Sequence, residues 1–258
     1  MILDEIVQAK KVELKKAKQI RKIVDLKAKA RNAAPLKPFE LRQNDAVSII
    51  AEIKRASPVK GVFKADLDPA DQATKYREGG ARAISVLTDE QFFKGSVDDL
   101  RAARKAAGLP ILRKDFVIDE YQLWEARVML ADAALLIVRI LDKAQLRDYI
   151  AMAREELKLA TLVEVHSAKE LDVALDAKAQ IVGINNRDLD TFKVTLETTA
   201  RLRADIPADR VVVSESGISR RDDIVLLKSM KVDAALIGEE LVKAENPTAK
   251  LKELLGTT

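Results

Sequence analysis

The chain has 258 residues, of which 48% are hydrophobic and none is cysteine. This length fits one large α/β domain, and the lack of cysteine excludes disulfides, zinc–thiolate sites, iron–sulfur clusters and thiol catalysis. No apolar stretch approaches the roughly 18 residues of a membrane span, and the N-terminus lacks a compact apolar segment with a cleavage site. We therefore expect a cytoplasmic protein that does not interact with membranes.

The formal net charge of +4 is unevenly distributed. Residues 1–45 hold 12 basic and 6 acidic residues, whereas residues 46–258 hold 33 and 35. Apolar residues with helical period run from Ile2 to about Ala33, and Pro35 and Pro38 end the pattern. Because no aromatic residues alternate with the basic ones, the pattern indicates a solvated, lysine-rich helix face packed against a larger domain, and we expect no nucleic acid partner.

After this extension, eight short apolar runs rich in β-branched residues recur at intervals of roughly 20 to 35 residues, the length of one βα unit. Most of them end in polar residues that a hydrophobic core would not favour. The runs are SIIAEIK ending at Lys54, AISVLT at Thr88, PILRK at Lys114, ALLIVR at Arg139, TLVE at Glu164, IVGIN at Asn185, VVVSE at Glu215 and ALIG at Gly238.

Segments with helical period follow these runs, so strand and helix alternate along the chain. An open doubly wound sheet also alternates in this way, but it usually has a glycine-rich turn after its first strand, where this chain reads KRASPVKG. We therefore predict an α/β fold of the (β/α)8 TIM barrel type over residues 46–258, with an N-terminal helical extension at 1–45. The predicted barrel helices are 68–78, 98–107, 120–130, 143–157, 168–177, 196–204, 220–229 and 247–255.

In such a barrel the carboxyl ends of the strands converge on one mouth, where the chemistry takes place. Glu52 and Lys54 are two residues apart, so they share a strand face and can neutralise each other. Lys114 ends the third run and can serve as a general acid or as a Schiff-base nucleophile. Glu164 ends the fifth run and can accept or donate a proton. Three strand ends with ionisable residues predict an active site.

The later strand ends add positioning groups. Asn185, or Asn186 beside it, supplies an amide, and the guanidinium of Arg187 suits a carboxylate or a phosphate. Gly217 and Gly238 follow the last two runs, where barrels often bind phosphate on backbone N–H groups and the start of a short helix.

Some positions stay open or carry no role. Alternation over residues 214–216 leaves either Glu215 or both neighbouring serines facing inward. His166, the only histidine, lies beyond the end of its strand and is interpreted as an ordinary loop residue. Thr88 and Arg139 end their runs without a role. With one histidine and no nucleotide-binding motif, we expect no metal and no cofactor.

Together the motifs IIAEIKRASPVKG, SVLTDEQFFKGS, PILRKDFVIDEYQ, ALLIVRIL, LVEVHS, GINNRDL, VSESGI and ALIGE closely resemble indole-3-glycerol phosphate synthase, in order and over nearly the whole chain. The resemblance implies a carboxy-lyase of tryptophan biosynthesis. Its substrate, 1-(2-carboxyphenylamino)-1-deoxyribulose 5-phosphate, undergoes ring closure, decarboxylation and dehydration to indole-3-glycerol phosphate. No metal or organic cofactor is implied.

The resemblance also assigns roles to residues. Lys114 would be the general acid for ring closure, Glu164 its partner in proton transfer and loss of hydroxide, and Lys54 a ligand of a substrate anion. Glu52, Asn185 and Glu215 would support them, with Ser216 nearby. Gly217 and Gly238 would hold the phosphate, with Ser57 and Arg187 as further anion contacts, and Phe93, Phe116 and Leu189 would line an apolar wall against the anthranilate ring.

Two positions depart from some relatives, which carry serine where Val59 and Glu239 stand. A carboxylate at residue 239 is expected to point away from the phosphate. Two other functions remain open, a Schiff-base sugar-phosphate aldolase and a noncatalytic or engineered phosphate-binding barrel. For the oligomeric state we expect a monomer or a weak homodimer.

Overall fold

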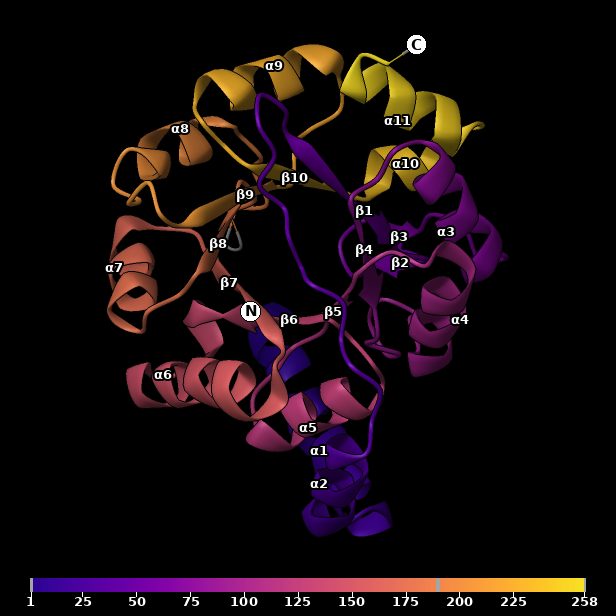
Figure 1. Ribbon diagram of the computed structural model, residues 1–258, viewed down its shortest axis with the longest axis vertical. Coiled ribbons are helices and arrows are strands. Elements are labelled where there is room, and N and C mark those ends of the chain that lie inside the picture. The colour runs from indigo at the N-terminus through magenta and orange to yellow at the C-terminus, as the bar shows by residue number, and fades with distance from the viewer. Residues whose placement is uncertain (1, 189–190, 258) are drawn as a thin grey trace.

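The computed structural model describes residues 2–188 and 191–257. Eight parallel strands form a closed barrel in the order β1-β10-β9-β8-β7-β6-β5-β4, and helices surround it (Figure 1). The predicted (β/α)8 barrel is therefore confirmed. The barrel strands are β1 (Ser48–Ile53), β4 (Ala83–Leu87), β5 (Ile111–Lys114), β6 (Ala133–Ile137), β7 (Ala160–Val165), β8 (Ile181–Asn185), β9 (Val211–Glu215) and β10 (Ala234–Ile237).

The helices that follow the strands agree with the predicted segments to within a few residues. The side chains of Asp68, Ser96 and Ser167 cap three of these helices. Each accepts hydrogen bonds from backbone N–H groups in the first turn that would otherwise lack partners. The surrounding helices are α3 (Pro69–Glu78), α4 (Val97–Ala107), α5 (Glu120–Val128), α6 (Lys143–Met152), α7 (Ala168–Asp176), α8 (Glu197–Arg203), α9 (Arg221–Ser229) and α11 (Pro247–Leu255).

Several short elements were not expected from the sequence. The loop after β1 contains a small antiparallel hairpin of β2 (Ala56–Ser57) and β3 (Gly61–Val62). A 3-10 turn, η1 (Val138–Ile140), follows β6, and a π-helical turn, η2 (Ala153–Leu157), continues α6. In contrast, the short helix α10 (Glu239–Lys243) follows β10, where the sequence predicted a phosphate site at the start of a short helix.

The barrel strands are buried on both faces, which explains their nearly continuous apolar runs. Outward-facing residues such as Ile49 and Val163 pack against the helices. Inward-facing residues such as Ile50, Leu112 and Leu162 fill the barrel interior. Because this packed core occupies the interior, the polar residues at the carboxyl ends of the strands gather at the mouth.

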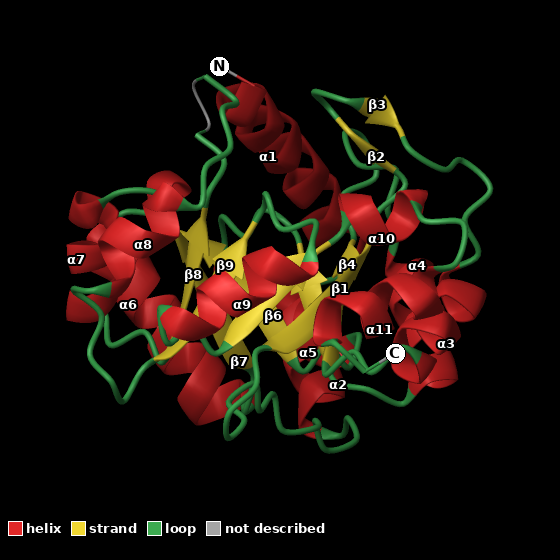
Figure 2. Ribbon diagram, turned by 90° about the horizontal axis from the view of Figure 1, so that it is seen from above, coloured by secondary structure: helices red, strands yellow, loops and turns green. Residues whose placement is uncertain are grey.

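The N-terminal extension forms two helices, α1 (Ile2–Ile20) and α2 (Ile23–Arg31), with a break at Arg21 and Lys22 where one helical segment was expected. Helix α1 lies over the same end of the barrel as the β2–β3 hairpin (Figure 2). Leu3 and Ile6 of α1 are buried and line the cavity at this end. Val12, which belongs to the predicted apolar stripe, is instead 57% exposed.

The connection between α2 and β1 runs across the opposite end of the barrel (Figure 1). Phe39 and Leu41 of this connection are buried and pack into the interior core with Ile50. The extension therefore covers both ends of the barrel.

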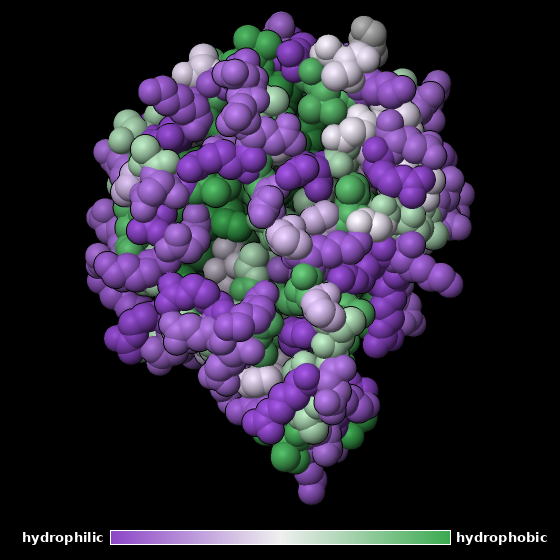
Figure 3. Space-filling model, viewed as in Figure 1, coloured by the Kyte–Doolittle hydropathy of each residue, from purple (hydrophilic) through white to green (hydrophobic). Residues whose placement is uncertain are grey.

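Hydrophilic residues dominate the face of the molecule seen in Figure 3, which has the same view as Figure 1, and they also cover much of the projecting N-terminal helices. None of the helices among the described residues is long and apolar enough to cross a membrane.

Candidate active site

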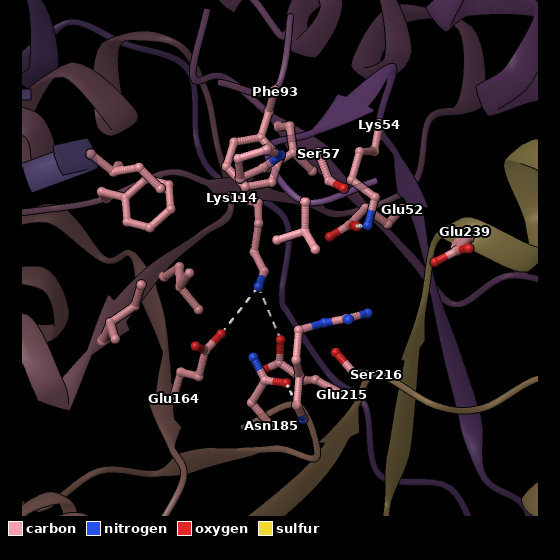
Figure 4. Close-up of a pocket in the computed structure, with 18 of the residues that line it drawn as sticks. Glu52, Lys54, Ser57, Phe93, Lys114, Glu164, Asn185, Glu215, Ser216 and Glu239 are labelled. Carbon is pink, nitrogen blue, oxygen red and sulfur yellow. Dashed lines mark hydrogen bonds and ion pairs between the residues drawn. The ribbon is translucent and has the colours of Figure 1, made fainter. Parts of the chain in front are cut away.

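A cavity of about 190 Å³ opens at the carboxyl ends of the barrel strands, bounded by strand-end residues, by the loop after β1 and by α1 (Figure 4). A neighbouring pocket shares Lys54 and Ser216 with it and includes Gly217 and Gly238. Leu189 lies outside the described residues. The other predicted site residues line the main cavity: Glu52, Lys54, Ser57, Phe93, Lys114, Phe116, Glu164, Asn185, Arg187, Glu215, Ser216 and Glu239.

Lys114 stands at the centre of this arrangement. Its Nζ donates hydrogen bonds to Glu164 Oε2 at 3.2 Å and to Glu215 Oε2 at 3.0 Å (Figure 4). The three residues come from β5, β7 and β9, so parallel strands far apart in sequence bring them together. The side chain of Lys114 is 14% exposed, whereas those of Glu164 and Glu215 are 5% and 2% exposed. All three side chains line the cavity, and the ammonium group is the most exposed of them.

The charges of this cluster shift its proton affinities. Burial alone would lower the pKa of Lys114, but the carboxylates of Glu215, Glu164 and Glu52 outweigh it and raise that pKa above its ordinary value. Lys114 is therefore an ammonium ion at neutral pH and a proton donor. This direction disfavours the aldolase hypothesis, because a Schiff base begins with attack by a neutral amine.

The pKa values of Glu164 and Glu215, which both accept hydrogen bonds from Lys114, are shifted in opposite directions. Burial raises the pKa of Glu215 to about 7, with the negative charge of Glu164 acting in the same direction and Lys114 opposing it. The pKa of Glu164 is lowered instead, because Lys114, His166 and a hydrogen bond from Asn185 together outweigh its burial. Near neutral pH, Glu164 is the ionised carboxylate and Glu215 the one that takes up a proton.

Glu52 and Lys54 form the expected ion pair, with Lys54 Nζ 2.8 Å from Glu52 Oε1. Burial of Glu52 would raise its pKa, but Lys54 and Lys114 lower it. A Cβ atom on Gly238 would lie 2.6 Å from Glu52 Oε1. Gly238 therefore makes room for the Glu52 carboxylate, a role that the phosphate hypothesis did not foresee.

The structure settles the orientation of residues 214–216. Glu215 points into the barrel, and Ser214 faces the helices, where its hydroxyl contacts Thr199 at 2.8 Å. Gly183 on β8 leaves space for the carboxylate of Glu215, because a Cβ atom at residue 183 would lie 2.3 Å from Glu215 Oε1. Ser216 has a φ of +68° and turns the chain back toward the cavity. Sequence reasoning missed Gly183, since a glycine within a strand gives no sign of its neighbour.

Asn185 and Asn186 have different roles. Asn185 lines the cavity, and its Oδ1 accepts a hydrogen bond from the backbone N–H of Arg187. Asn186 is buried, and its Nδ2 donates to the backbone oxygens of Glu215 and Ser216, both at 3.0 Å. Asn186 therefore fixes the turn that follows β9, so only Asn185 belongs to the cavity.

The predicted phosphate pocket lies where α10 begins. Gly217 has a φ of +79°, a backbone conformation that glycine adopts without strain. Glu239 also lines this pocket. Its carboxylate accepts hydrogen bonds from Lys60 at 2.7 and 2.8 Å and from Lys243 at 2.7 Å. Two lysines therefore neutralise the carboxylate that stands where some relatives carry serine.

On the opposite side the cavity is apolar. The rings of Phe93 and Phe116 face each other with centroids 5.9 Å apart. Phe93 belongs to the loop after β4, and Phe116 follows β5. These two rings, with Ile6 of α1, give the cavity one wall suited to a flat hydrophobic group.

His166 is more than the ordinary loop residue expected from the sequence, and that interpretation was wrong. Its ring is 8% exposed, with Nε2 3.4 Å from Glu164 Oε1 and Nδ1 3.1 Å from Glu170 Oε2. Burial of His166 would lower its pKa, but Glu170 and Glu164 raise it. The two carboxylates thus favour the protonated imidazole, whose charge in turn lowers the pKa of Glu164. The parity that His166 shares with Glu164 was the only sign of this contact in the sequence.

Thr88, which had no assigned role, donates a hydrogen bond to Asp115 Oδ2 at 2.6 Å.

Within residues 2–188 and 191–257, no group of three or more histidine, cysteine, aspartate or glutamate side chains is arranged to hold a metal ion. The cavity therefore offers acids, bases and hydrogen-bond donors at its centre, cations at one end and aromatic rings at the other.

Comparison with known proteins decides the family. The model of the indole-3-glycerol phosphate synthase family matches residues 3–254. The chain belongs to this family. It is 49% identical over 261 residues to indole-3-glycerol phosphate synthase of Desulfosudis oleivorans, covering 99% of each chain. It is 48% identical over 257 residues to that of Acetivibrio thermocellus, covering 98% of each. The family predicted from the sequence motifs is thus confirmed.

A solved structure supports the fold alone. The 3-hexulose-6-phosphate synthase of Salmonella typhimurium superposes with a TM-score of 0.66 at 11% identity, covering 82% of this chain and 98% of that one. Membership in the indole-3-glycerol phosphate synthase family makes the chain a carboxy-lyase of tryptophan biosynthesis. Its substrate is a phosphorylated small molecule.

Proposed function

We propose that this site closes the indole ring of 1-(2-carboxyphenylamino)-1-deoxyribulose 5-phosphate and releases carbon dioxide and water. The observation that carries the proposal is the protonated Lys114 held between Glu164 and Glu215 at the cavity. Aromatic rings lie on one side of this lysine, and the pocket that contains Gly217 and Gly238, the proposed phosphate site, lies on the other. That order matches a substrate with an aryl carboxylate at one end and a phosphate at the other.

Ring closure requires an acid at the ketone oxygen. In the proposed step the aryl carbon that bears the carboxylate attacks the ketone carbon, and Lys114 donates its proton to the ketone oxygen. Loss of carbon dioxide then returns its bonding electrons to the ring. Loss of the new hydroxyl as water, with removal of one proton from the ring, completes the indole. Glu164 serves with Lys114 in these last proton transfers.

The remaining residues hold and orient the substrate. Lys54, neutralised in part by Glu52, takes a substrate anion. Backbone N–H groups at Gly217 and Gly238, with Ser216 beside them, take the phosphate. Ser57 and Arg187 add anion contacts from the rim. Binding the phosphate far from the reacting carbon fixes the geometry of ring closure.

Glu239 lines the phosphate pocket and would repel the phosphate by itself. Its ion pairs with Lys60 and Lys243 offset that repulsion, and Lys60 also lines the pocket. The aryl ring packs against the wall formed by Phe93 and Phe116, and the predicted contact of Leu189 with this ring lies outside the described residues. We keep a monomer or weak homodimer and a cytoplasmic location as predictions.

The test is direct. Purified protein is incubated with the substrate, and indole-3-glycerol phosphate is followed by its indole fluorescence. We expect catalytic turnover without added metal. The absence of product at high enzyme concentration would overturn the proposal.

A second arm tests the aldolase hypothesis. Borohydride is added during turnover, and the protein is examined by mass spectrometry. We expect unmodified lysines, because Lys114 is held as an ammonium ion. A stable adduct of substrate mass on Lys114 or Lys54 would favour the aldolase.

A further inference from the structure

Lys10 of α1 occupies a position that an apolar residue would normally take. The buried residues of α1 are Leu3, Ile6 and Lys10, and their spacing places them on one face of the helix toward the barrel. The side chain of Lys10 is only 2% exposed. Burial of an ammonium group is costly unless it is paired, so its partners indicate why it is there.

Lys10 Nζ has three carboxylate partners: Glu13 one turn along α1, at 2.7 Å and 55% exposed, and two buried carboxylates of the barrel loops. Lys10 Nζ lies 3.0 Å from Asp89 Oδ2 and 3.0 Å from Asp115 Oδ1. Asp89 is in the loop after β4, and Asp115 directly follows Lys114 at the end of β5. Their side chains are 2% and 0% exposed. Burial alone would lower the pKa of Lys10, but Asp115 and Asp89 raise it, so the lysine stays charged.

Each of these carboxylates also holds the backbone of one wall residue. Asp89 Oδ1 accepts hydrogen bonds from the backbone N–H groups of Phe92 at 2.8 Å and Phe93 at 3.3 Å. Asp115 Oδ1 accepts one from the backbone N–H of Phe116 at 2.8 Å. A single ammonium group therefore joins the two loops that carry Phe93 and Phe116.

We infer that Lys10 is a positioning residue that sets the spacing of Phe93 and Phe116 and so shapes the aryl-binding side of the cavity. Lys10 itself does not line this cavity and acts through Asp89 and Asp115. The same contact pins α1, whose Leu3 and Ile6 line the cavity. The inference rests on the proposed function for the identity of the aryl group, but the spacing of the two rings can be measured without it.

The chain offers a matched control. Lys18, on the same helix, pairs with Asp119 at 2.8 Å, also joining α1 to the barrel. That pair is solvent-exposed, with Lys18 45% and Asp119 29% exposed, and neither residue lines the cavity. Lys10→Met and Lys18→Met thus remove the same group from the same helix, but only the first removes the link between the two phenylalanine loops.

The experiment compares wild type, Lys10→Met, Lys18→Met and Asp89→Asn at a temperature where circular dichroism shows all four folded. For Lys10→Met we expect KM to rise about tenfold with kcat within threefold, since small displacements of binding groups weaken substrate orientation. Asp89→Asn, which weakens one arm of the bridge, should show a smaller rise. Lys18→Met should keep the wild-type KM. Lys10→Met with an unchanged KM in the folded protein would mean that Lys10 only stabilises.

A crystal structure of Lys10→Met separates failure of this inference from failure of the proposed function. We expect the Phe93 and Phe116 rings to move apart from the 5.9 Å centroid distance. Should the wild type make no product, the proposed function falls, and the ring distance still decides the role of Lys10. A variant with both rings in their original places would overturn the inference.

Discussion

Two lysines of this chain, Lys114 and Lys10, each contact two buried carboxylates, yet their surroundings differ, and we propose opposite uses for them. Lys114 faces a cavity and is 14% exposed, whereas Lys10 is 2% exposed. Around Lys114 one carboxylate atom, Glu215 Oε1, has no hydrogen-bond partner among the described residues. Around Lys10 every oxygen of Asp89 and Asp115 is engaged.

The difference shows what separates a reactive ion cluster from a structural one. Burial raises the pKa of Glu215 to about 7, so the Lys114 cluster can exchange a proton near neutrality. At the Lys10 cluster, Arg113 and Lys10 outweigh burial and hold the pKa of Asp115 at about 2, so that carboxylate stays charged. A cavity-facing cluster with more carboxylates than cations can change its protonation state, as catalysis requires. A buried cluster in which the charges balance stays ionised and holds its segments in place.

The largest effect that this comparison predicts comes from Lys114. Replacing Lys114 with alanine removes the general acid, so kcat should fall by about 10³-fold or more. Without Lys114, either Glu164 or Glu215 can take up a proton, which relieves the repulsion between the two carboxylates, so the fold should persist. Steady-state kinetics and the circular dichroism spectrum provide the check. A near-normal rate would show that the acid is another residue.

Glu164→Gln should have the next largest effect. The amide keeps the shape of the side chain but cannot take up a proton, so kcat should fall by about 10²-fold. KM should change little, because the proposed substrate-binding contacts come from other residues and glutamine keeps the shape of the side chain. Single-turnover kinetics with substrate titration separate the two parameters. A rise in KM with an unchanged kcat would contradict the proposed role.

Removal of residues 1–31 tests the contribution of the extension as a whole. The truncated chain loses Leu3 and Ile6 from the cavity and leaves Asp89 and Asp115 without Lys10. We expect KM to rise by about tenfold or more, together with a lower melting temperature. Unchanged kinetics and stability would show that the extension plays no part in binding.

The smallest predicted effect is on the pH dependence of stability. A raised carboxyl pKa means that the folded chain binds the proton more tightly than the unfolded chain does. Glu215 therefore contributes stability fully below its ordinary pKa of 4.5, and this contribution is lost as pH rises through about 7. The loss amounts to about 1 kcal/mol per pH unit within that window.

Glu215→Gln should flatten this slope. Its melting temperature should fall less than that of the wild type between pH 5 and 7.5, as measured by scanning calorimetry in matched buffers. Wild type and variant contain the same other titrating groups, including His166, so the difference between their slopes isolates Glu215. Parallel pH profiles would show that Glu215 has an ordinary pKa.

Much of the barrel and of its mouth could be predicted because both depend on local order in the sequence. A buried parallel strand needs a continuous apolar run, and the residue at its carboxyl end points to the mouth wherever the strand lies. That reasoning found Lys114 and Glu164 without knowing whether they meet, and it left open whether Glu215 or the two serines beside it face the mouth. The contacts between them required β5, β7 and β9 to be placed in one closed sheet.

What the sequence could not supply are pairings between distant segments. Nothing in a lysine-rich first helix distinguishes Lys10 from its solvated neighbours until α1 lies across the barrel and Asp89 and Asp115 lie beneath it. The same holds for Gly183 beneath Glu215 and for His166 beside Glu164. The sequence alone determined the positions of the strands and helices along the chain, the family motifs and the chemical types at the strand ends, because these follow from local periodicity and residue identity. The tertiary structure alone decided which charges are paired, which carboxyl group has a raised pKa and which lysine is buried away from the cavity, because these depend on distance, burial and neighbouring charge.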